Sequence, residues 1–295
     1  MDAELIVDAR NATGESPVWS AAEQALFWVD IPAGRLHRWD AASAGHQSWQ
    51  APHMLACIAR HAGGGWIAGM EDGVYRLAAQ NDGSLQATLL SAVQHASAGM
   101  RFNDGRCDRQ GRFWAGTMLM DMAAGAAVGA LYRYAAGQAE PLQARLDGFI
   151  VPNGLAFSPD GNIMYLSDSH PDVQKIWAFD YDTDTGTPYN KRLFVDMNHY
   201  LGRPDGAAVD ADGCYWICGN DAGLIHRFTP AGKLDQSLNV PVKKPTMCAF
   251  GGPDLDTLYV TSIRPGGDIG DQPLAGGVFA FRPGVKGLEE PAFKG

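Results

Sequence analysis

The chain has 295 residues and a formal charge of −10, from 23 basic and 33 acidic side chains. Nucleic acids and anionic membranes attract basic patches, so this charge argues against both as partners and favours a small, uncharged or metal-bound ligand. With 36 Gly, 17 Pro, 10% aromatic and only 19% charged residues, the composition favours many short strands joined by tight turns, and we expect an all-β fold.

The N-terminal segment MDAELIVDAR carries acidic residues where a signal peptide would carry basic ones, and no apolar run approaches the length that crosses a bilayer. We therefore expect a cytoplasmic protein. The five cysteines are odd in number and scattered, which indicates buried free thiols and not a disulfide framework. Because no apolar stripe demands a partner subunit, a monomer is the expected state.

One short pattern recurs along the whole chain: a turn rich in Gly or Asp, then apolar residues that end in an aromatic. It appears in SAAEQALFW, HAGGGW, DRQGRFW, SPDGNIMY, DADGCYW and GPDLDTLY. The closing aromatics are 38 to 51 residues apart: Trp28, Trp66, Trp114, Tyr165, Trp216 and Tyr259. A second pair of strand-like runs follows each aromatic, as in GRLHRWD and GALYRYA. The period therefore predicts six repeated units of about four short strands each.

Six such units predict a six-bladed β-propeller with four-stranded blades. One four-stranded sheet cannot bury both of its faces, whereas six sheets around an axis can, leaving only short protected edges. No linker or change of composition divides the chain, so residues 1–295 are expected to form a single domain. We expect the segment LIVDA, at about residues 5–9, to add a strand to the last blade and close the ring.

The innermost strand of each unit should begin 11 to 13 residues before its aromatic, at the rim of the central channel. Four of the six positions there carry oxygen: Glu15, Met54, Asn103, Asn153, Asp205 and Met247. Buried like charges repel and unpaired polar groups are costly, so a divalent cation in the channel would resolve this arrangement. Oxygen ligands suit hard ions such as Ca²⁺, Mg²⁺ or Mn²⁺. Asn and Asp before Gly are also ordinary turn residues, but their recurrence in four units favours a metal site.

Several long segments occur in one order along almost the entire chain: GESPVW, RFNDGRCDRQGRFWAGTM, VPNGLAFSPDG, RPDGAAVDADGCYW and GGVFAFRPGVKG. In these segments the chain resembles the SMP-30/gluconolactonase family, which includes regucalcin and bacterial sugar lactonases. The resemblance implies a six-bladed propeller with one divalent metal in its channel, with Ca²⁺, Zn²⁺, Mg²⁺, Mn²⁺ and Fe²⁺ all open as its identity.

The resemblance also implies roles for particular residues. Glu15, Asn153 and Asp205 stand in the matching motifs as metal ligands, and Asp205 as the catalytic base as well.

The same resemblance implies substrate contacts from Arg101, Asn103 and Asp121. Regucalcin-like members tend to carry Glu at the position of Asp121. The Asp side chain of this protein is shorter than Glu and reaches less far toward a substrate. For Arg101 an ion pair with Asp104 or Asp121 is the structural alternative.

The expected function is metal-dependent hydrolysis of a sugar (aldono)lactone to the aldonic acid in carbohydrate catabolism. One alternative is a metal-dependent esterase or phosphotriesterase on the same fold, whose site should be lined by aromatic side chains instead of hydroxyl-binding groups. The other is a non-enzymatic calcium-binding propeller, which has no reason to place polar side chains of four blades at one depth.

Overall fold

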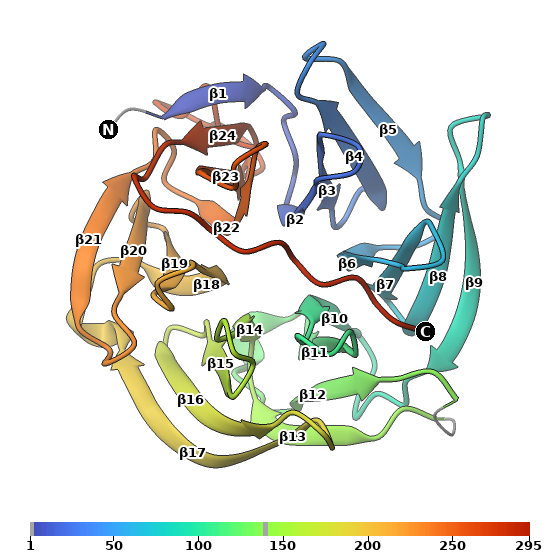
Figure 1. Ribbon diagram of the computed structural model, residues 1–295, viewed down its shortest axis with the longest axis vertical. Coiled ribbons are helices and arrows are strands. Elements are labelled where there is room, and N and C mark those ends of the chain that lie inside the picture. Colours follow the sequence, from blue (N-terminus) through green and yellow to red (C-terminus); the bar gives the residue numbers. More distant parts are fainter. Residues whose placement is uncertain (1–2, 138–140) are drawn as a thin grey trace.

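A computed structural model describes residues 3–137 and 141–295 of the chain. Its strands form six antiparallel sheets of four strands each, arranged as blades around a central axis (Figure 1). The prediction of an all-β, six-bladed propeller is therefore confirmed. Two short 3-10 helices, η1 (Met122–Ala124) and η2 (Met197–His199), lie in loops. Within the described ranges, no helix has the length and apolar character needed to cross a bilayer.

In the first five blades the strands follow chain order, with the first strand next to the axis and the fourth at the rim (Figure 1). The first blade contains β2 (Gly14–Ser20), β3 (Ala25–Asp30), β4 (Arg35–Asp40) and β5 (His46–Gln50). The second contains β6 (Leu55–Arg60), β7 (Trp66–Met70), β8 (Gly73–Ala79) and β9 (Leu85–Ala92). The third contains β10 (Met100–Cys107), β11 (Phe113–Leu119), β12 (Gly129–Tyr134) and β13 (Ala144–Phe149). The fourth contains β14 (Pro152–Phe157), β15 (Ile163–Asp168), β16 (Lys175–Asp182) and β17 (Thr187–Asp196). The fifth contains β18 (Arg203–Val209), β19 (Tyr215–Asn220), β20 (Leu224–Phe228) and β21 (Leu234–Asn239).

The sixth blade joins the two ends of the chain. It contains β22 (Pro245–Gly251), β23 (Thr257–Ser262), β24 (Val278–Phe281) and, at its rim, β1 (Glu4–Val7). β1 pairs antiparallel with β24, so that Glu4 lies opposite Ala280. The strand expected at about residues 5–9 thus starts one residue earlier, at Glu4, and ends two residues earlier, at Val7.

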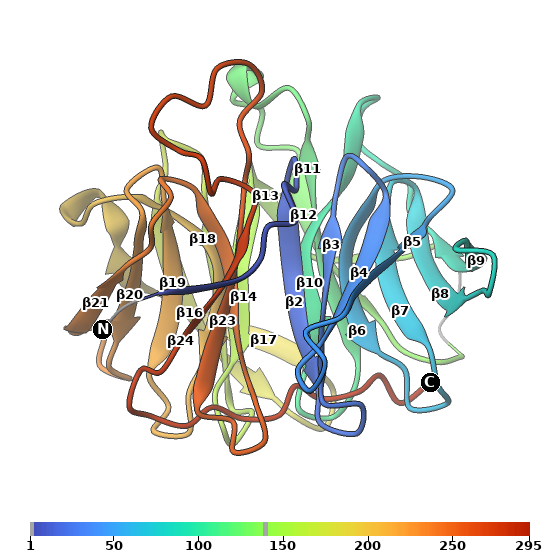
Figure 2. The ribbon, with the colours of Figure 1, turned by 90° about the horizontal axis from the view of Figure 1, so that it is seen from above.

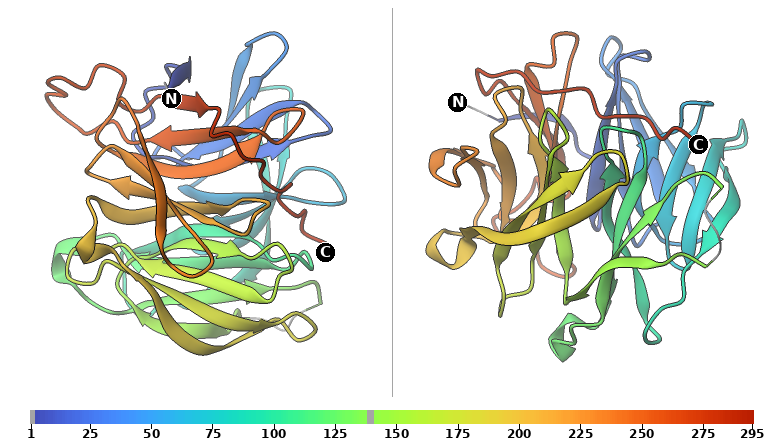
Figure 3. Two further views of the ribbon diagram at one scale, coloured as in Figure 1. Left: turned by 60° about the vertical axis from the view of Figure 1, so that its left-hand side comes forward. Right: turned by 60° about the horizontal axis from the view of Figure 1, so that its bottom comes forward.

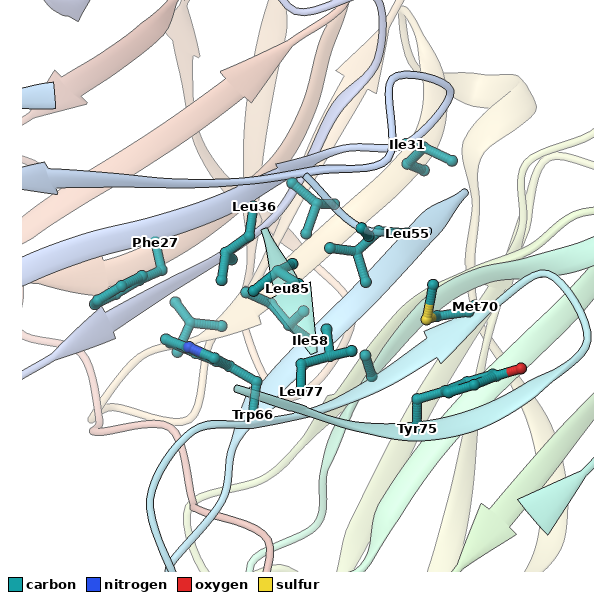
Figure 4. Close-up of a cluster of buried hydrophobic side chains, with 14 of the residues drawn as sticks. Phe27, Ile31, Leu36, Leu55, Ile58, Trp66, Met70, Tyr75, Leu77 and Leu85 are labelled. Atoms are coloured by element: carbon teal, nitrogen blue, oxygen red, sulfur yellow. The ribbon is translucent and has the colours of Figure 1, made fainter. Parts of the chain in front are cut away.

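Apolar side chains pack between neighbouring blades. Figure 4 shows one such layer, in which Phe27 and Leu36 of the first blade meet Trp66 and Leu77 of the second. The rings of Phe27 and Trp66 are 4.6 Å apart. All six recurring aromatics are buried, from Trp28 in the first blade to Tyr259 in the sixth. The five cysteines are also buried and free, as predicted. The repeated sequence pattern is therefore a pattern of packing between blades.

After β24 the chain crosses one end of the channel as a strap, residues 284–295 (Figures 1 and 2). Backbone hydrogen bonds tie this C-terminal strap to four blades. The N–H of Gly287 donates to the carbonyl of Leu255 (2.7 Å), that of Ala211 to Lys286 (2.8 Å), that of Phe293 to Arg60 (2.7 Å) and that of Lys294 to Gly111 (3.0 Å). Figure 2 and the right-hand view of Figure 3 place the η1 loop at the opposite end of the channel. The C-terminal strap therefore crosses one end of the channel, and loops border the other.

Two side chains of the C-terminal strap are anchored in the ring. Glu290 forms a 3.1 Å ion pair with Arg106, whose side chain is only 8% exposed. Phe293 is buried, with ring centroids 5.6 Å from Tyr134 and 5.4 Å from His61. The C-terminal strap is thus a second clasp across the ring, in addition to the pairing of β1 with β24.

We predict that Phe293→Ala lowers the free energy of unfolding by about 3 kcal/mol, because a buried ring is lost and a cavity remains. Urea unfolding of the two proteins measures the difference. Leu193→Ala is the control, since Leu193 is 55% exposed and its loss should change the stability by less than about 0.5 kcal/mol. Equal effects of the two substitutions would show that the C-terminal strap is not a stabilising clasp.

Candidate functional site

The innermost strand of every blade departs from regular pairing near its start. In each of β2, β6, β10, β14, β18 and β22 the register with the next strand shifts. Four of these shifts begin at or just before an oxygen-bearing residue: at Glu15, at Phe102 before Asn103, at Asn153 and at Pro204 before Asp205. Because a β-bulge re-aims side chains relative to the regular alternation, these shifts bring the polar side chains to the channel.

Close packing of the inner strands explains the glycines that follow Asn153 and Asp205. A Cβ atom on Gly154, whose φ is +59°, would lie 2.5 Å from the Tyr215 hydroxyl, and one on Gly206 would lie 2.4 Å from the Cβ of Met247. Both Asn–Gly and Asp–Gly pairs lie inside strands. They are therefore not hairpin turns, and glycine is needed because a neighbouring strand passes too close for a side chain.

Asp205 is held at both of its carboxylate oxygens. Its side chain is buried, and its Oδ1 accepts a 2.6 Å hydrogen bond from Nδ2 of Asn153 in the neighbouring blade. Its Oδ2 accepts a second 2.6 Å bond from Nδ2 of Asn220, the last residue of β19. Asn220 was not among the predicted site residues, since it lies on the second strand of its blade and is not reached by counting along the first.

Glu15 is a second buried carboxylate, close enough to Asp205 for their charges to interact. It is 9% exposed, and its Oε2 accepts a 3.2 Å hydrogen bond from the backbone N–H of Ser16. Burial raises the pKa of Glu15 well above its usual value, and the carboxylates of Asp205 and Asp104 raise it further. Burial also raises the pKa of Asp205 to about 7, against the opposing effect of the Asn220 hydrogen bond.

Asp104 adds a third carboxylate that sequence reasoning had considered only as an ion-pair partner. Its Oδ2 accepts a 2.8 Å hydrogen bond from the backbone N–H of Leu155, while its Oδ1 is buried and has no hydrogen-bond partner among the residues that the structure describes. Burial raises the pKa of Asp104 as well. The sequence could have indicated this residue, because Asp104 directly follows Asn103 in the segment RFNDG.

The donors in this channel fit a hard divalent cation. Glu15 and Asp205 offer carboxylate oxygens and Asn153 an amide oxygen, the ligand types that such ions prefer. A cation at these residues would offset the repulsion between the two carboxylates and favour their ionised forms. In the described part of the chain, no group of three or more His, Cys, Asp or Glu side chains forms a metal-binding cluster. The predicted ligand set has only two such residues, because its third member is an amide.

Arg101 and Asn103 lie beside these ligands. Nη1 of Arg101 donates to Oδ1 of Asn103 at 3.0 Å, and Nδ2 of Asn103 donates to the carbonyl of Pro152 at 3.2 Å. Arg101 forms no salt bridge with Asp104 or Asp121 in the described ranges, so the structural alternative for this residue does not hold. Its guanidinium group is instead close enough to Glu15 for their charges to interact.

Asp121 is the one predicted site residue that the structure leaves apart from the ring. It precedes η1 in the loop at the open end of the channel, and its side chain is exposed and does not cap the helix. The loop is held to the next blade by a 3.1 Å hydrogen bond between Nε2 of His170 and the carbonyl of Met122. A contact between Asp121 and substrate stays a prediction.

We predict that Gly206→Ala lowers the free energy of unfolding by about 2 kcal/mol and weakens binding of Mn²⁺, because β18 must move away from Met247 and take Asp205 with it. Urea unfolding and titration calorimetry measure the two effects. Gly266→Ala is the matched control, since Gly266 has no atom within 4 Å of the added Cβ. A Gly206→Ala protein that binds Mn²⁺ as tightly as this control would contradict the prediction.

Comparison with known proteins agrees with this architecture. The chain is 40% identical to 6-deoxy-6-sulfogluconolactonase of Pseudomonas putida over 99% of this chain and 98% of the relative. It is 36% identical to regucalcin of Sus scrofa, with the same shares of both chains covered. The crystal structure of a calcium-binding protein, regucalcin, from Agrobacterium tumefaciens superposes with a TM-score of 0.89, at 28% identity, over 99% of this chain and 97% of that one. Residues 13–264 match the model of the SMP-30/gluconolactonase/LRE-like region, and the chain belongs to this family.

Proposed function

We propose that this protein hydrolyses a sugar lactone to the aldonic acid, with one divalent cation held by Glu15, Asn153 and Asp205. The observation that carries the proposal is the buried Asp205 carboxylate, fixed by two amides and close to the charge of Glu15. The named relative from Pseudomonas putida and the family support a lactone as the substrate. We further propose that the reaction belongs to carbohydrate catabolism.

The polar groups beside the ligands favour a sugar over an aryl ester. An aryl-ester or organophosphate site needs aromatic walls, whereas Arg101 and Asn103 offer hydrogen bonds to hydroxyl groups. Arg101 already donates to neutral oxygens only, the Asn103 amide and the carbonyl of Phe102. A hydroxyl-rich substrate can take the place of such partners without leaving a carboxylate unpaired.

Asp205 is the proposed base. A carboxylate in this position can accept the proton of the attacking water and return it to the ring oxygen that leaves when the lactone opens. Asn153 and Asn220 fix the carboxylate while it does so, which limits the reorganisation that proton transfer requires. When bound, the divalent cation supplies Lewis-acid stabilisation of the negative charge that develops on the carbonyl oxygen.

The first test is hydrolysis of a panel of lactones by chelator-treated protein in a pH-stat. The panel contains pentono- and hexonolactones and 6-deoxy-6-sulfogluconolactone, each with and without Mg²⁺, Mn²⁺, Ca²⁺, Zn²⁺ or Fe²⁺. We expect turnover of at least one lactone to be lost on chelation and restored by a cation. Cation binding without hydrolysis of any lactone would instead favour a non-enzymatic calcium-binding propeller.

A second prediction separates the assigned roles of Asp205 and Arg101. Asp205→Asn should lower kcat by about 100-fold or more and also weaken cation binding, because both proton transfer and a ligand charge are lost. Arg101→Met should mainly raise KM, by about 10-fold, without weakening the binding of Mn²⁺, because the variant removes a positive charge near Glu15. Near-normal turnover in Asp205→Asn would remove Asp205 from the mechanism, and loss of Mn²⁺ binding in Arg101→Met would make Arg101 part of the cation site.

A further inference from the structure

We infer that Asn220 is a positioning residue, which holds the Asp205 carboxylate in the orientation needed for cation binding and proton transfer. The inference concerns a residue that is neither a proposed ligand nor a proposed substrate contact. It rests on the proposed function for its catalytic part, while the effect on cation binding can be measured independently of any reaction.

The contact is direct and short. Asn220 ends β19 and lies opposite Arg203, the first residue of β18, while Asp205 follows two residues later inside the bulge. From this position Nδ2 of Asn220 reaches Oδ2 of Asp205 at 2.6 Å, and both residues are buried. Hydrogen bonds from a neutral donor to a carboxylate are shorter and stronger than those between neutral groups, and burial strengthens them further.

The amide of Asn220 has only one useful orientation. Rotating it by 180° would place its Oδ1 against the carboxylate oxygen, where two acceptors repel each other. In the observed orientation Oδ1 is buried and has no partner among the described residues. An unpartnered buried acceptor is unfavourable for the stability of the fold. Burial of Oδ1 therefore lowers the stability of the fold, and the hydrogen bond from Nδ2 to Asp205 is the interaction that this orientation of the Asn220 side chain provides.

The side-chain amides of Asn153 and Asn220, which both donate to Asp205, differ in their other proposed interactions. Asn153 comes from the fourth blade and is itself a proposed ligand of the cation. Asn220 comes from the same blade as Asp205 and makes no other side-chain hydrogen bond in the described ranges. A cation would bind Oδ1 of Asn153 while its Nδ2 still donates to Asp205, so Asn153 serves two groups and Asn220 serves the carboxylate alone. Hydrogen-bond partners of metal ligands typically change metal affinity or activity by about 10 to 100-fold when they are removed.

Two variants test this role: Asn220→Ala removes the donor, and Asn220→Leu removes it while filling the space. Asn239→Ala is the matched control, because Asn239 is an exposed residue on the outer strand of the same blade. The measurements are the dissociation constant for Mn²⁺ by calorimetry, kcat and KM at saturating Mn²⁺ for the best lactone of the panel, and the melting temperature without metal.

We expect both Asn220 variants to bind Mn²⁺ about 10 to 100-fold more weakly and to lose about 10-fold or more in kcat. KM should stay within about 3-fold of the wild-type value, and at least Asn220→Leu should keep the melting temperature of the metal-free protein. The control should match the wild type in every measurement. This combination would not arise from a purely structural role, which moves the melting temperature and leaves the folded fraction with normal kcat and Mn²⁺ affinity.

The outcomes separate this inference from the proposed function. If the wild type opens a lactone and both Asn220 variants keep its kcat and Mn²⁺ affinity, the inference is wrong and the proposed function stands. If no lactone is opened but the variants bind Mn²⁺ at least 10-fold more weakly, the lactonase proposal fails and the positioning of Asp205 toward a cation stands. A loss of activity that follows only the fraction of unfolded protein would also overturn the inference.

Discussion

Closure of the ring is the constraint on which the candidate site depends. Glu15 belongs to the first blade, whereas Asn153 and Asp205 belong to the fourth and fifth, so no local segment of chain holds these side chains together. Their separation is fixed only when β1 pairs with β24 and the first and last blades become neighbours. The C-terminal strap adds a second connection across the same ring through Glu290 and Phe293.

The closed ring forces like charges into one buried space. Glu15, Asp104 and Asp205 lie in a channel whose walls remove them from water, and burial is the largest cause of the raised pKa of each. Stability alone would favour apolar side chains at these positions, since replacing buried ionic groups with well-packed apolar ones is often neutral or stabilising. The three buried carboxylates therefore destabilise the fold, and the proposed cation binding and proton transfer account for their presence.

Much of this architecture was predictable because it repeats. The recurring aromatics indicated six packed blades, and counting back from each aromatic reached Glu15, Asn153 and Asp205 on the inner strands. The same count could not show that the Asn–Gly and Asp–Gly pairs lie in strands, because the bulges and the close approach of Met247 to Gly206 are tertiary features.

The residues that sequence reasoning missed lie outside the single position per blade that the count reaches. Asn220 approaches Asp205 from the second strand of its blade, and this contact depends on where the bulge in β18 places the carboxylate. The C-terminal strap follows the last repeat and has no equivalent in the other blades. Its path across the channel could not be inferred from a pattern that describes single blades.

The two ends of the channel differ in structure, because the C-terminal strap crosses only one of them. The C-terminal strap crosses one end, where it is hydrogen-bonded to Arg60 and Gly111. The other end is bordered by loops, among them the one that carries Asp121 and is tied to the next blade through His170. The proposed ligands Glu15, Asn153 and Asp205 lie near this loop-bordered end, at the starts of the inner strands. Substitutions in these loops can therefore alter access to the proposed site without disturbing the inner strands, whose spacing tolerates no added atom at Gly206.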